Sequence, residues 1–93
     1  MSAYEILKKN NKDLRKRFHL KSIGVFGSHA SGKPTPKSDV DILVEYSRSV
    51  DFFEFLELKE YLETLLGNKV DLVTKRALKP LIKKEILKQV IYV

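Results

Sequence analysis

The chain has 93 residues, enough for a single domain spanning residues 1–93 and too few for two independent hydrophobic cores. It contains no cysteine, which excludes a disulfide framework, a cysteine-ligated zinc site and a thiol nucleophile. The start has no signal-peptide layout, and no apolar run approaches the roughly 20 residues that cross a bilayer. We therefore expect a soluble, cytoplasmic protein with no membrane partner.

The net charge of +6 is unevenly distributed along the chain. Residues 1–22 carry seven Lys and Arg against two acids, and residues 75–93 carry six against one. Residues 45–74 are acidic, with three basic residues against seven acids. Basic ends attract phosphate-bearing partners, but lysine-rich faces are also common on solvated helices, and nucleic acid is not expected as a partner.

Hydrophobic spacing predicts a helix over about 3–17, with Ser2 and Glu5 forming a capping box at its start. A short apolar strand follows at 22–26, and Ser28 is placed to open a helical stretch over 28–32. Two prolines make 33–38 a loop.

The second half continues the alternation of helices and strands. The sequence predicts a strand at 39–46, a helix at 51–66 that Gly67 ends, and a strand at 69–74. A last helix begins near Pro80 and runs to 90, before an apolar end, 91–93, that either docks onto the core or joins a partner. The order αβαβαβα predicts an α/β fold, α+β-like, with a three-stranded mixed sheet flanked by helices.

Asp39 and Asp41 lie two residues apart on a predicted strand, so both side chains point to one face while Val40 and Ile42 fill the other. Paired carboxylates repel each other unless a cation lies between them, and Mg²⁺ prefers carboxylate oxygen. Alone, the pair is weak evidence, because a solvated strand edge explains it equally well.

Asp71 strengthens the metal hypothesis, because it interrupts the otherwise apolar strand Val70-Asp71-Leu72-Val73. If this strand lies next to the strand of Asp39 and Asp41, the three carboxylates can converge. Such a set suits two metal ions in a phosphoryl or nucleotidyl transfer. The alternative for Asp71 is a surface-facing position on an edge strand.

Gly27 and Ser28 follow a predicted strand and offer a tight turn, backbone N–H groups and a hydroxyl, which together suit a phosphate. Residues 27–33 also match the first seven positions of a Walker A loop. Pro34 argues against that loop, since proline supplies no hydroxyl for Mg²⁺. An aspartate-nucleophile phosphatase is also disfavoured, because its acidic pair follows a strand whereas Asp39 begins one.

The residues that carry these arguments resemble the active-site motif of the DNA polymerase beta nucleotidyltransferase superfamily. Gly27-Ser28, ten intervening residues, Asp39-Val40-Asp41 and the later Asp71 match that motif. Gly-Ser-x-Ala-x-Gly, Ser-Asp-x-Asp-Ile-Leu-Val and the C-terminal segment resemble the minimal nucleotidyltransferase (MNT) proteins over essentially the whole chain.

The resemblance implies a Mg²⁺-dependent nucleotidyltransferase that uses ATP. It implies that Gly27 and Ser28 hold the triphosphate and that Lys33 and Lys37 add nucleotide contacts. It implies further that Asp39, Asp41 and Asp71 are catalytic and hold two Mg²⁺ ions. Many relatives carry an arginine where this chain has Ser31, so Lys33, Lys37 or Arg48 compensates or the enzyme is slower.

Minimal members are commonly antitoxins encoded beside a HEPN ribonuclease toxin, and some transfer AMP to a tyrosine of that toxin. The resemblance therefore implies a HEPN-type toxin as partner, in a homo-oligomer or hetero-oligomer. The main alternative is an antitoxin, catalytically weak or inactive, that neutralises its toxin by binding. A basic nucleic-acid-binding module is a third hypothesis, which the charged ends of the chain suggest.

Overall fold

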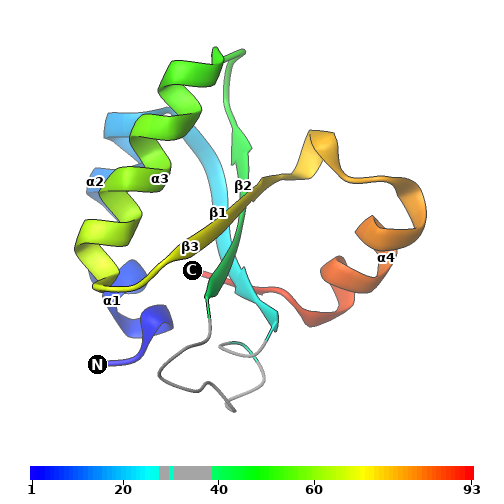
Figure 1. The fold of residues 1–93 in the computed structure, drawn as a ribbon, viewed down its shortest axis with the longest axis horizontal. Coiled ribbons are helices and arrows are strands. Elements are labelled where there is room, and N and C mark those ends of the chain that lie inside the picture. Colours follow the sequence, from blue (N-terminus) through cyan, green and yellow to red (C-terminus); the bar gives the residue numbers. More distant parts are fainter. Residues whose placement is uncertain (28–29, 31–38) are drawn as a thin grey trace.

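The structure is a computed structural model that describes residues 1–27, 30 and 39–93. The described elements are listed here in chain order: helices α1 (Ala3–Lys9) and α2 (Asn11–Phe18), strands β1 (Leu20–Phe26) and β2 (Val40–Tyr46), helix α3 (Phe52–Leu66), strand β3 (Val70–Thr74), the 3₁₀ turn η2 (Lys75–Ala77), helix α4 (Pro80–Gln89) and strand β4 (Ile91–Tyr92). Figure 1 shows α1, α2 and α3 on one side of the sheet and α4 on the other.

The sheet is mixed and flanked by helices, as predicted, but the prediction of three strands was wrong. The described part of the chain forms four strands in the order β3-β2-β1-β4. β1 runs antiparallel to both β2 and β4, whereas β2 and β3 are parallel and are connected through α3. The additional strand, β4, is a two-residue segment at the C-terminal end, too short for its alternation to be seen in the sequence.

The predicted first helix is divided into α1 and α2 at Asn10. The Nδ2 of Asn10 donates a hydrogen bond to the carbonyl of Ile6 at 2.8 Å, and its backbone N–H ends α1 on the same carbonyl. An asparagine side chain that bonds the local backbone competes with helical continuation, which explains the break. The capping box of Ser2 and Glu5 is confirmed.

The later helix boundaries follow the predicted signals closely. Asp51 caps α3 and forms a capping box with Glu54, while Gly67 ends α3 with φ of 65° in the left-handed region. Pro80 occupies the first turn of α4, where its missing N–H has no helical partner in any case.

The two faces of the sheet differ in chemistry because successive residues of a strand alternate between them. One face packs against α1, α2 and α3 and forms the core, which consists of Leu7, Leu14, Leu20, Ile23, Val25, Val40, Ile42, Val44, Leu58, Leu62, Val70 and Leu72. The intervening positions of β2 and β3, Asp41, Glu45, Asp71 and Val73 among them, face the side of α4. Val40, Ile42 and Val44 lie on the core face, opposite Asp41, as predicted, but Leu43 on the side of Asp41 is also buried.

The apolar C-terminal end docks onto the sheet, which was one of the two outcomes left open. Ile91 pairs with Val25, and Tyr92 pairs with Gly24. A Cβ on Gly24 would stand 2.6 Å from Cγ2 of Val90, so glycine lets the C-terminal segment approach the strand. Ile91 and Tyr92 nevertheless remain 43% exposed, which leaves room for a partner as well. No helix among the described residues is long and apolar enough to cross a membrane.

Candidate functional site

The carboxylates singled out in the sequence lie at the beginning of the two parallel strands. Asp41 is the second residue of β2 and Asp71 the second residue of β3, and the strand register pairs their Cα positions directly. Both side chains therefore project from the α4 side of the sheet on adjacent strands. Asp39 immediately precedes β2. The expectation that the third strand lies beside the second is confirmed.

Gly27 joins this site from the other neighbour of β2. β1 ends at Phe26, which pairs with Asp41, so Gly27 emerges beside the carboxylate pair. Its φ of 70° lies in the left-handed region, and a Cβ built on it would collide with Oδ2 of Asp41. Only glycine fits both the backbone conformation and the space. The chain backbone thus passes directly against an acidic side chain.

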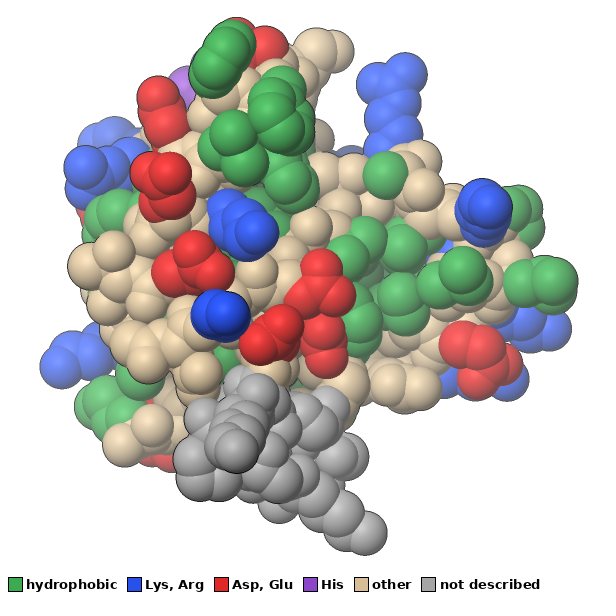
Figure 2. All heavy atoms as spheres, viewed as in Figure 1, with side chains coloured by type: hydrophobic (Ala, Val, Ile, Leu, Met, Phe, Trp, Pro, Cys, Tyr) green, Lys and Arg blue, Asp and Glu red, His purple; other side chains and the backbone are tan. Residues whose placement is uncertain are grey.

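The three acids differ in exposure: Asp39 and Asp71 are exposed, and Asp41 is half-buried. Figure 2 shows acidic side chains gathered beside the undescribed segment, where β2 and β3 begin. Among the described residues, however, no three acidic or histidine side chains come close enough together to form a ready metal site. The donor set of carboxylate oxygens and the cradle at Gly27 fit a hard divalent ion such as Mg²⁺.

Four other residues discussed from the sequence, Ser28, Ser31, Lys33 and Lys37, lie outside the described residues. Their assignment to the nucleotide therefore stays a prediction, as does the helical stretch over 28–32. Arg48, named as a possible substitute for the absent arginine, lies at the opposite end of β2. Its guanidinium pairs with Glu54 at 3.0 Å and donates to the Ser49 carbonyl.

Sequence reasoning missed a second cluster of charged residues on the α4 side of the sheet. It lies where β2 and β3 end and contains Glu45, Lys75, Arg76 and Lys83. The signal in the sequence was the excess of basic residues after residue 74, which was interpreted as attracting phosphate-bearing partners or as a solvated helix face. Its members come from three elements, so no local spacing unites them.

A mixed sheet with a glycine turn set against carboxylates on adjacent strands is compatible with an enzyme that acts on phosphate groups. Comparison with known families identifies this class: the profile of the nucleotidyltransferase domain matches residues 7–93. The chain belongs to this family and is an enzyme of the nucleotidyltransferase class. The resemblance drawn from Gly27, Asp39, Asp41 and Asp71 is confirmed at the level of the family.

Individual relatives agree with this assignment. The protein adenylyltransferase MntA of Thermococcus cleftensis is 50% identical over 88 residues, which cover 95% of this chain and 89% of the relative. A solved structure provisionally described as a minimal nucleotidyltransferase superposes with a TM-score of 0.82 at 31% identity, covering 98% of this chain and 95% of that one. A toxin-antitoxin structure with AMP-PNP gives a TM-score of 0.78 at 26% identity, covering 91% of this chain and 70% of that one.

Proposed function

We propose that this protein transfers AMP from ATP to a hydroxyl-bearing residue of a HEPN-type toxin and thereby acts as an antitoxin. The observation that carries the proposal is the position of Gly27 against Asp41, with Asp71 beside it on the neighbouring strand. The names of the relatives support it, since one is a protein adenylyltransferase and another is part of a toxin-antitoxin structure with a nucleotide analogue.

In the proposed site, Asp39, Asp41 and Asp71 hold two Mg²⁺ ions. When bound, these ions would neutralise phosphate charge and make the attacking hydroxyl more acidic. Gly27, Ser28, Lys33 and Lys37 bind the triphosphate through backbone N–H groups, a hydroxyl and two ammonium groups. The glycine backbone lets a phosphate approach Asp41 without a side chain in between.

The reaction forms one bond and breaks one. The acceptor oxygen bonds to the α-phosphorus of ATP, the bond from that phosphorus to the β-phosphate oxygen breaks, and pyrophosphate leaves with the electron pair. The acceptor hydroxyl loses its proton. The carboxylate of Asp71 is exposed, so it can take up this proton and pass it to solvent.

A mass measurement on the partner tests the proposal. A candidate HEPN-type partner is co-expressed with the wild type, with Asp71→Asn, and with Asp13→Asn, a matched change of an exposed acid on α2. We expect added AMP on the partner with the wild type and Asp13→Asn, and none with Asp71→Asn. An unmodified partner that is still neutralised by Asp71→Asn would favour neutralisation by binding alone.

A further inference from the structure

An open pocket of about 850 Å³ lies on the acid-bearing side of the sheet, at the opposite end of β2 from the carboxylates. Its walls come from the end of β2, the connection to α3, the end of β3 with η2, and α4. Asp41 stands near one end of the open face, and Glu45, which lines the pocket, stands near the other. Four residue steps along β2 separate these two positions by about 13 Å.

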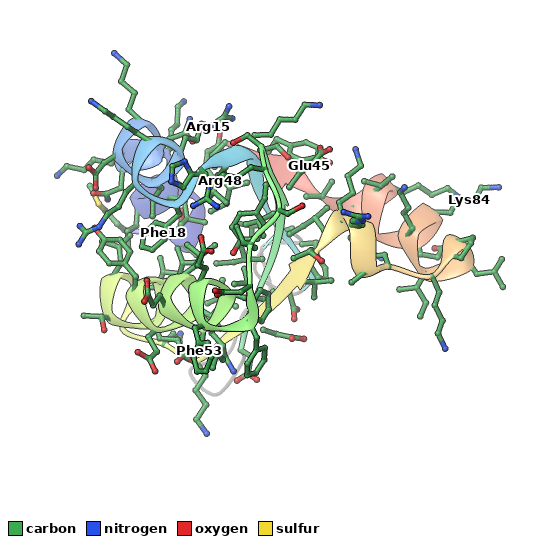
Figure 3. The ribbon with its side chains drawn as sticks, turned by 90° about the horizontal axis from the view of Figure 1, so that it is seen from above. Arg15, Phe18, Glu45, Arg48, Phe53 and Lys84 are labelled. Carbon is green, nitrogen blue, oxygen red and sulfur yellow. The ribbon has the colours of Figure 1, made fainter. Side chains whose placement is uncertain are left out.

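The cations of this pocket are not all used within the chain. Lys75 pairs with Glu45 at 3.8 Å, and Arg48 is turned to Glu54 on α3. Figure 3 shows Glu45 on the side of the sheet that faces α4 and Arg48 on the side of α2.

Arg76 and Lys83 line the same pocket and make no ion pair within the part of the chain that the structure describes. They come from η2 and α4, so the fold, and not a local run of sequence, brings them to one pocket. Two unpaired cations at one concave site favour an anionic ligand.

The position of the pocket favours the acceptor over the nucleotide as the source of that anion. The nucleotide is expected at Gly27, beside the beginning of β2, whereas Arg76 and Lys83 lie where β2 and β3 end. Between the two ends of β2, Leu43 is already buried within the chain, and the apolar surface left for a partner includes the half-buried Val73 and Ile82 of α4, which is 52% exposed. Figure 2 shows hydrophobic side chains extending from the acidic group towards α4.

A protein segment fits this spatial order of carboxylates, apolar surface and cationic pocket. Its hydroxyl would lie at the carboxylates, its apolar side chains would cover the middle of the face, and an acidic residue would enter the pocket. A nucleic-acid strand would instead present a charged backbone, with no apolar side chains to cover Ile82 and Val73.

We propose that Arg76 and Lys83 bind an acidic side chain of the acceptor protein, at the end of β2 opposite to the carboxylates that receive its hydroxyl. This inference rests on the proposed function, and it deepens that function by naming what the acceptor must present. An extended acceptor covers the roughly 13 Å of β2 between Asp41 and Glu45 in about four residues, and a helical one in about nine. The pocket thereby selects which hydroxyl reaches the carboxylates.

A binding measurement without ATP tests this proposal separately from AMP transfer. The probe is a fluorescein-labelled copolymer of glutamate and tyrosine, followed by fluorescence anisotropy. The pocket variant combines Arg76→Glu with Lys83→Glu. The control combines Lys12→Glu on α2 with Lys84→Glu, which changes the net charge equally outside the pocket; Figure 3 shows Lys84 pointing away from the sheet.

We expect the pocket variant to bind the copolymer about tenfold or more weakly than the wild type, and the control within about twofold. Melting curves of both variants check that the fold is kept. Equal losses of affinity in the two variants would show that only net charge matters and would overturn the proposal.

Failure of the wild type to bind the copolymer would also overturn the proposal. A labelled oligouridylate that binds more tightly than the copolymer and is weakened selectively by the pocket variant would assign the pocket to nucleic acid instead. If the protein binds the copolymer selectively but transfers no AMP, the proposed role of the pocket is kept and only the proposed enzymatic function is refuted.

Discussion

Gly27 and Asp41 occupy adjoining space so closely that a single added carbon on Gly27 would meet the Asp41 carboxylate. Their neighbours along the chain fix this approach, because Phe26 and Asp41 are paired across β1 and β2. The proposed phosphate turn and the proposed metal ligand are therefore positioned by one strand pair, so a change of Gly27 also disturbs Asp41.

We predict that Gly27→Ala abolishes nucleotide transfer. The new Cβ would strain a backbone at φ of 70°, at a cost of about 1–2 kcal/mol, and would also displace the Asp41 side chain. The matched control is Gly67→Ala, which has a similar φ of 65° but open space around its Cβ. Thermal melting and transfer assays should show comparable destabilisation in both variants, with activity lost only in Gly27→Ala. Full activity in Gly27→Ala would show that this turn does not bind the nucleotide.

The carboxylates themselves give a second prediction. Asp41→Asn and Asp71→Asn should each abolish transfer and leave the melting temperature unchanged or slightly raised, because repulsion between the two register partners is relieved. Asp13→Asn, an exposed acid on α2, serves as the control. Transfer rates are measured with labelled ATP and Mg²⁺. Wild-type rates in either carboxylate variant would remove that residue from the catalytic set.

Much of this arrangement was predictable because its signals are local. The alternation of Val40, Asp41 and Ile42 assigned the faces of β2, and Asp51 and Gly67 marked the ends of α3. What sequence reasoning missed depends on distant residues. β4 exists because Ile91 meets Val25, and the cation pocket exists because η2 and α4 return to the end of β2. Neither β4 nor the cation pocket produces a periodic pattern in the sequence.

Gly24 allows a third prediction, about the C-terminal segment. Gly24→Ala places a Cβ 2.6 Å from Val90 Cγ2 and 3.1 Å from the Ile91 carbonyl oxygen. The segment must shift, and overpacking of this kind costs about 1–3 kcal/mol. Denaturant unfolding of Gly24→Ala, Val90→Ala and the double variant measures this loss of unfolding free energy. We expect Val90→Ala to recover part of the loss, because it removes the colliding methyl groups. Independent, additive effects would show that β4 is not held through this contact.

The last prediction concerns Tyr46, whose hydroxyl is buried and has no hydrogen-bond partner among the described residues. Burial, with a smaller contribution from the charge of Glu54, raises the pKa of Tyr46 to about 12 from an ordinary value of 10. Ionisation is therefore more favourable in the unfolded chain than in the folded protein. The stability that Tyr46 contributes is fully present below pH 10 and is lost as the pH rises through 10 to 12.

Tyr46→Phe should remove this alkaline loss and leave stability at neutral pH unchanged or raised by up to about 1 kcal/mol, since an unsatisfied buried hydroxyl disappears. The measurement is unfolding by urea at neutral pH and at several values between 10 and 12. Tyr92→Phe is the matched control, because Tyr92 is 43% exposed. All other ionisable groups are the same in Tyr46→Phe and the wild type, so the difference between their pH profiles isolates the tyrosine. Parallel pH profiles for Tyr46→Phe and the wild type would mean that the hydroxyl is solvated in the folded protein.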